Sequence, residues 1–156
     1  MLNNEITKQF LLTPSAGKKL IAKSFVCIPE IKKALNEQTI VIIAGTTNAY
    51  IVKELLNCIG ESDNFSTKGF HRGITLPPGY KTDAQTTGFP GDVIIEKGVL
   101  IKGKTIFDVV DDLDKGDIIL KGANAVNLVS RKAGVLIGHP KGGTIQAALT
   151  AVIGKR

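Results

Sequence analysis

The stretch Thr39-Ile40-Val41-Ile42-Ile43-Ala44, followed directly by Gly45-Thr46-Thr47-Asn48, decides the fold expected for this chain. The apolar run Thr39–Ala44 is continuous and β-branched, which favours a parallel strand covered on both faces. Gly45–Asn48 then turns the chain. Ala49–Cys58 has apolar residues at helical spacing. Strand, short polar turn and helix open a βαβ unit, so the sequence predicts the α/β class.

Strands and helices are also predicted over the rest of the chain. The expected elements are a helix over 16–26 with Ser15 as its N-cap, a helix over 30–36 with Pro29 at its first position, a hairpin of 92–95 and 99–101, a helix over 106–113 opened by a capping box of Thr105 and Asp108, a strand over 118–120, a strand over 134–137 and a helix over 144–153. We expect a single α/β domain spanning residues 1–156.

The segment Gly60–Gly91 differs in composition from the rest of the chain, because it is rich in Gly and Pro yet carries four aromatic residues. Of this segment only Phe70–Leu76 could form a strand. Structureless stretches of this length are usually lids, binding loops or disordered, and the aromatic residues argue against simple disorder. We therefore expect a long loop or lid at residues 60–91, closing over a site or packing against another subunit.

The composition and charge of the chain exclude some classes of function. The 156 residues include 17 Gly and carry a formal net charge of +6, but the basic residues are scattered rather than gathered on one face with aromatics, which argues against a nucleic-acid partner. No signal peptide and no membrane span are expected. Cys27 and Cys58 lie in apolar contexts that predict buried, reduced thiols, so we expect the cytoplasm.

Three glycine-bearing turns follow predicted strands and suggest a ligand site. The carboxyl ends of parallel strands share one sheet edge, and ligands bind in the crevice there. Two of the turns also lead into helix N-termini, whose free N–H groups favour anions. The sequence thus predicts a pocket for a phosphate or carboxylate, against the alternative that these residues only shape turns. Its candidate residues are Gly45, Thr46, Thr47, Asn48, Lys121, Gly122, Asn124, His139, Lys141, Gly142, Gly143 and Thr144.

Other chemistry has little support in the sequence. His71 and His139 have no ligand-like spacing with each other or with the cysteines, so we expect no metal site. No P-loop, dinucleotide fingerprint or hydrolase elbow occurs, and we expect no cofactor.

Several segments together resemble the superfamily of ribose-5-phosphate isomerase, DeoR-type sugar-phosphate sensor domains and CoA transferases. They are 18–23, 39–44, 45–49, 117–125 and 138–144. The resemblance implies a Rossmann-like three-layer α/β domain with a mostly parallel sheet. It also implies a sugar phosphate as the anionic metabolite, held at the sheet edge.

The departures from that superfamily leave catalysis open. The acidic motif of the isomerase and its catalytic Glu have no counterpart here, because Asn124 and Asn127 stand where acids would be needed. We expect a protein that binds a small anionic metabolite without chemistry. Two alternatives are an isomerase or lyase whose base is Asp83 or Asp92, and a homo-oligomeric interaction module that uses the aromatic loop as its interface.

Overall fold

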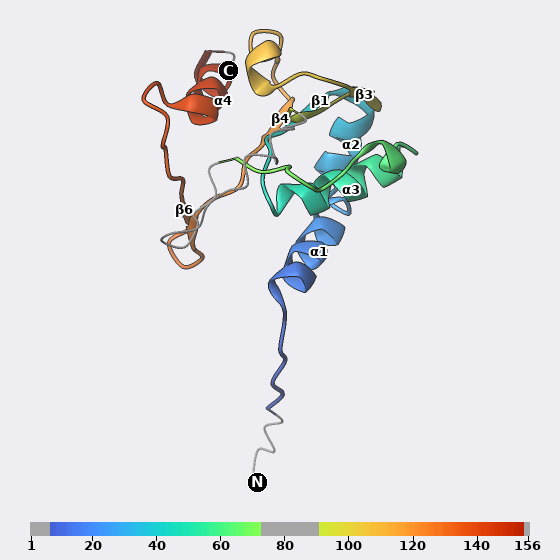
Figure 1. Ribbon diagram of the computed structural model, residues 1–156, viewed down its shortest axis with the longest axis vertical. Helices are drawn as coiled ribbons and strands as arrows, with labels where there is room; N and C mark the ends of the chain where they lie inside the picture. Colours follow the sequence, from blue (N-terminus) through green and yellow to red (C-terminus); the bar gives the residue numbers. More distant parts are fainter. Residues whose placement is uncertain (1–6, 73–90, 155–156) are drawn as a thin grey trace.

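A computed structural model describes residues 7–72 and 91–154. Figure 1 shows a sheet-and-helix body from which the N-terminal arm and the C-terminal part extend. The elements in order are α1 (Pro14–Phe25), α2 (Pro29–Glu37), β1 (Thr39–Ile42), α3 (Asn48–Cys58), the 3-10 helix η1 (Ser62–Asn64), β2 (Val93–Glu96), β3 (Val99–Ile101), the 3-10 helix η2 (Ile106–Asp108), β4 (Ile118–Leu120), β5 (Ala125–Asn127), β6 (Lys132–Gly134) and α4 (Gly143–Gly154).

The main sheet has the strand order β3-β2-β1-β4, and it corrects the expected fold. Within the described chain only β1 and β4 pair in parallel, with Ile40 opposite Ile118. β2 runs antiparallel to β1, with Ile42 opposite Val93, and β3 runs antiparallel to β2. The prediction of a mostly parallel, Rossmann-like sheet is therefore wrong. The chain leaving α3 returns as one arm of a tight hairpin rather than through a βαβ crossover.

Both faces of β1 are buried, as its continuous apolar run predicted. Ile40 and Ile42 point into a core that includes residues of α1, α2 and α3. Val41 and Ile43 point to the opposite face, where Ile106 of η2 and Ala147 of α4 are buried. The alternation of a strand sends successive side chains to opposite faces, so each face receives half of the run.

The helix boundaries agree with the sequence except at two places. The N-cap of α1 is Thr13, not Ser15, because Pro14 takes the first helical position and Thr13 Oγ1 accepts a hydrogen bond from Ala16 N at 3.2 Å. The expected helix over 106–113 is only the short η2. Its capping box is confirmed, with Asp108 Oδ2 accepting from Thr105 N at 2.7 Å.

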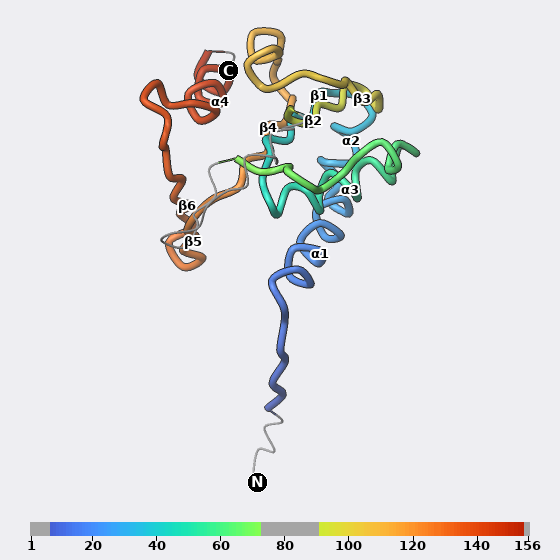
Figure 2. Tube along the Cα trace, in the orientation of Figure 1, coloured from blue at the N-terminus to red at the C-terminus, as the bar shows by residue number. Residues whose placement is uncertain are grey.

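The prediction of a C-terminal strand over 134–137 is wrong. Residues 125–127 and 132–134 instead form a separate antiparallel hairpin, β5–β6, which lies apart from the main sheet in Figure 2. Its connection is a local turn, in which Asn127 Oδ1 accepts from Ser130 N at 3.0 Å and Arg131 adopts a positive φ of 52°. Local side-chain hydrogen bonding of this kind favours a hairpin over a strand that joins the main sheet.

The expected burial of the two thiols is also wrong. Cys27 and Cys58 are both exposed and unpaired, because one follows the last turn of α1 and the other closes α3 on its outer side. In the segment predicted to be a lid, Phe70 is buried and its ring meets that of Phe65 edge to face at 5.0 Å. No strand forms at residues 70–72, and positions 73–90 lie outside the described residues.

Candidate functional site

The first predicted turn, Gly45–Asn48, uses its polar side chains to hold the fold together. Asn48 is buried, and its Nδ2 donates to the carbonyl oxygen of Ile43 at 2.7 Å and to that of Leu120 at 3.3 Å. It thereby links the carboxyl ends of β1 and β4. Thr46 Oγ1 accepts a hydrogen bond from Lys18 Nζ at 2.9 Å. Both groups are thus engaged within the chain rather than directed at a ligand.

Asp92 forms a second buried junction at the same sheet edge. Its Oδ1 accepts from Ala44 N at 3.0 Å, and its Oδ2 accepts from Ile106 N at 2.9 Å. Arg72 Nη2 lies 3.6 Å from Oδ1. Since both carboxylate oxygens are committed to backbone donors, Asp92 serves as a structural anchor. The other base suggested by the sequence, Asp83, lies outside the described residues.

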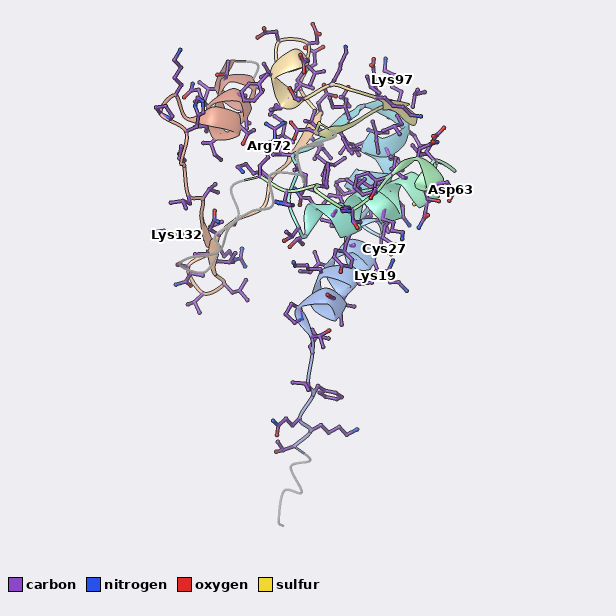
Figure 3. All side chains as sticks on the ribbon, in the orientation of Figure 1. Lys19, Cys27, Asp63, Arg72, Lys97 and Lys132 are labelled. Carbon is purple, nitrogen blue, oxygen red and sulfur yellow. The ribbon has the colours of Figure 1, made fainter. Side chains whose placement is uncertain are left out.

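A cavity of about 760 Å³ opens beside this junction. Its walls come from the end of β4, from the region of η2 and from the chain that leads into α4. The lining residues are Arg72, Phe107, Val110, Lys121, Leu136, Ile137, Gly138, His139, Lys141, Gly142, Gly143, Thr144, Ile145, Gln146, Ala147 and Thr150. The set combines cationic side chains with an apolar wall and includes no carboxylate. Arg72 lies between the sheet and α4 in Figure 3.

The charges around the cavity influence one another. The pKa of Lys121 is lowered from its ordinary value, chiefly because burial disfavours the ammonium ion. The negative charge of Asp92 raises that pKa, and the nearby positive charge of Arg72 lowers it further. Lys121 and Arg72 therefore both feel the charge of one buried carboxylate, that of Asp92, and an added anion would offset the repulsion between the two cations.

The turn before α4 places the N-terminus of that helix at the cavity. His139 Nδ1 accepts from Lys141 N at 3.1 Å, and the carbonyl oxygen of His139 accepts from Gly142 N at 2.9 Å. Gly142 and Gly143 both have positive φ, of 78° and 54°. Consecutive left-handed residues without a Cβ allow the chain to reverse sharply into the helix. The first N–H groups of α4 lie at the cavity wall as a result.

The structure brings together only half of the predicted site. Lys121, His139, Lys141, Gly142, Gly143 and Thr144 line the cavity. The residues of the expected three-turn site that do not line it are Gly45, Thr46, Thr47, Asn48, Gly122 and Asn124. Asn124 instead closes the β5–β6 hairpin, since its Oδ1 accepts from Leu136 N at 2.9 Å. In the first turn, Asn48 bonds the strand ends and Thr46 bonds Lys18 of α1, so these two side chains serve the fold.

Sequence reasoning missed Arg72 and the apolar wall. Arg72 is far in sequence from Lys121 and Lys141, and it lies beside Asp92, which follows only after the segment 73–90. No pattern in the sequence singled out Arg72. Phe107 and Leu136 belong to segments whose predicted helix and strand do not form.

Comparisons with models of protein families, with curated proteins and with solved structures found no match to this chain. The resemblance to the sugar-phosphate superfamily therefore stays a prediction. The prediction of a Rossmann-like fold is wrong. Neither the described residues nor the comparisons support the prediction that the chain binds a phosphate or a sugar. Within residues 7–72 and 91–154, no helix has both the length and the apolar character to cross a membrane.

Proposed function

We propose that this protein binds a small organic anion with an apolar body in the cavity beside α4. One observation carries the proposal: Arg72, Lys121 and Lys141 come from three separate segments to line one cavity, and none of the lining residues that the structure describes is a carboxylate. The cavity volume of about 760 Å³ lies within the range typical of small-molecule sites. The apolar wall of Phe107, Leu136 and their neighbours would receive the carbon skeleton of the ligand.

Two physical effects favour an anion at this place. Arg72 and Lys121 are partly withdrawn from solvent, so a bound carboxylate would interact with them more strongly than at a fully exposed site. The N–H groups at the start of α4, around Gly143 and Thr144, add donors and the positive end of the helix dipole. Asp92 offsets part of the positive charge, which leaves room for one small anion rather than a polyanion.

We propose binding rather than turnover. A base that abstracts a proton must lie within hydrogen-bond reach of it, and Asp92, a base suggested by the sequence, is committed to Ala44 N and Ile106 N. We also propose a cytoplasmic location, since Cys27 and Cys58 are both exposed as free thiols and a reducing compartment preserves such thiols.

The experiment is a thermal-unfolding series with matched probes. Hexanoate and benzoate are compared with the neutral hexanamide and benzamide, and inorganic phosphate serves as an anion without an apolar body. We expect the carboxylates to raise Tm, the amides to have no effect and phosphate to act weakly. A probe at 100 times its Kd stabilises the fold by about 2.7 kcal/mol.

Matched variants locate the effect. Arg72→Gln and Lys121→Gln should each weaken carboxylate binding about tenfold, equivalent to about 1.4 kcal/mol. Lys132→Gln on β6 is the control, because it removes the same charge from a residue that does not line the cavity. Native mass spectrometry of the purified protein searches for a co-purifying anion. The proposal fails if no carboxylate shifts Tm and no anion co-purifies, or if Lys132→Gln weakens binding as much as the two cavity variants.

A further inference from the structure

The C-terminal helix α4 has an apolar face that no other described part of the chain covers. Its twelve residues, Gly143–Gly154, include no charged side chain. Ala147 is buried against the sheet, while Leu149, Val152 and Ile153 are 46%, 55% and 65% exposed. A contiguous exposed apolar patch on a folded protein marks an interaction site. We define the outer face of α4 by Leu149, Val152 and Ile153, and we expect another apolar surface to pack against it.

The N-terminal arm, residues 7–12, is a second uncovered apolar element. It forms neither helix nor strand, and Phe10, Leu11 and Leu12 are 83%, 98% and 59% exposed. In Figure 2 the arm leaves α1 and points away from the body, whereas α4 lies at the other end of the long axis. Since the arm and α4 occupy opposite ends of the molecule, the arm cannot cover the outer face of α4 in its own copy.

We infer that the arm of one copy packs on the outer face of α4 in a second copy, and that the second copy returns the same contact. One chain carries both halves of the contact, so two copies related by a two-fold axis can satisfy both at once. This inference does not depend on the anion proposal, because Leu149, Val152 and Ile153 do not line the anion cavity.

The available area is sufficient for a specific dimer. At about 100 Å² of apolar surface for each of these side chains, the two reciprocal contacts together bury about 1,200 Å², near the lower bound for specific interfaces. The charge pattern also fits. Lys8 is the one charged residue in the arm, and α4 has none, as expected for the charge-depleted centre of an interface.

The test measures the mass of the 156-residue chain in solution by sedimentation velocity over a range of concentrations. We expect a dimer. Leu11→Glu in the arm and Ile153→Glu in α4 should each raise the dimer Kd at least tenfold. Gln9→Glu is the matched control, because it adds the same charge to the same arm without removing an apolar side chain. Circular dichroism verifies that each variant keeps its helices.

A mixing experiment distinguishes the reciprocal contact from general loss of folding. In a heterodimer of Leu11→Glu with Ile153→Glu, one arm–α4 contact is doubly altered and the other is entirely native. Mixing the two variants should therefore restore dimer that neither forms alone.

Photocrosslinking identifies the surface that the arm contacts. A photoreactive amino acid at position 10 should capture a peptide of α4, and mixed isotope labelling should show that this peptide belongs to another copy. A monomer at every concentration, a dimer that Leu11→Glu leaves intact, or a crosslink to the exposed Leu128 and Val129 of the hairpin or to the same copy would each overturn the inference. So would a monomer that associates with lipid vesicles through α4.

Discussion

Arg72 Nη2 lies 3.6 Å from Asp92 Oδ1, at the point where the end of β1, the start of β2 and the start of η2 meet. The same carboxylate holds two backbone donors from those elements. The cation at the cavity is therefore positioned by a group whose main task is to join the two faces of the sheet. The stability of the fold and the proposed anion binding should therefore both depend on Asp92.

Replacing Asp92 by Asn should destabilise the fold by about 2–4 kcal/mol, since it removes a buried, charge-assisted acceptor and turns an amide N–H toward a backbone N–H. Urea denaturation measures the change. Asp112→Asn is the control, because Asp112 is exposed and the same change of charge there should alter stability by less than about 0.5 kcal/mol. Equal stability of the two variants would show that Asp92 is not the anchor described.

Replacing Asn48 by Ala should cost about 1–3 kcal/mol, because the carbonyl oxygen of Ile43 loses the amide donor that lies 2.7 Å from it. The anion affinity of the folded variant should stay within about twofold of the original, since Asn48 does not line the cavity. Asn57→Ala in the same helix, at an exposed position, is the control for helix propensity. A large loss of affinity in Asn48→Ala at unchanged stability would instead favour the first turn as a ligand site.

Replacing Gly142 by Ala should disturb the turn that leads into α4. Gly142 has a φ of 78°, and a Cβ there would lie 2.8 Å from Gln146 Cβ. The left-handed conformation alone costs about 1–2 kcal/mol for a residue with a side chain, and the close contact adds to it. The variant should show a lower Tm and weaker carboxylate binding. Gly122→Ala is the control, because a Cβ at Gly122 meets nothing within 4 Å; an equal loss there would contradict the argument.

Local sequence patterns predicted the elements better than their assembly. The β-branched run of β1, the hairpin of β2 and β3, and helix α3 each follow from composition and spacing over a few residues. The direction of β2 does not, because it depends on antiparallel pairing between residues far apart in the sequence, such as Ile42 and Val93. The order of the elements predicted the α/β class, but it did not predict that most strand pairs in the main sheet are antiparallel.

The candidate site could likewise be predicted only where its residues are neighbours in the sequence. His139, Lys141 and the glycines before α4 form one local turn, so their neighbourhood was visible in the sequence. Arg72 joins them through a contact with Asp92, twenty positions further along the chain, which no local pattern predicts. Asn48 and Asn124 were predicted as ligand groups because polar side chains in turns resemble binding residues. Their hydrogen bonds show that turn residues also close the backbone on itself.

The pH dependence of anion binding should report on Lys121. Burial, assisted by the positive charge of Arg72 and opposed by Asp92, lowers the pKa of Lys121 in the free protein. A bound carboxylate stabilises the ammonium ion, so the pKa rises in the complex and binding takes up protons. Affinity should therefore fall as pH increases through the pKa of free Lys121, by at most about tenfold per pH unit for one proton.

Calorimetry of hexanoate binding in two buffers of different ionisation enthalpy measures this proton uptake, and NMR of ¹³C-labelled lysines follows Lys121 itself. Arg72→Gln should raise the pKa of Lys121 in the free protein, because a nearby positive charge is removed. The Lys132 signal is the internal control and should not move when hexanoate is added, since Lys132 does not line the cavity. Binding without proton uptake through the titration of Lys121, or an unchanged Lys121 signal on saturation, would place the anion away from this side chain.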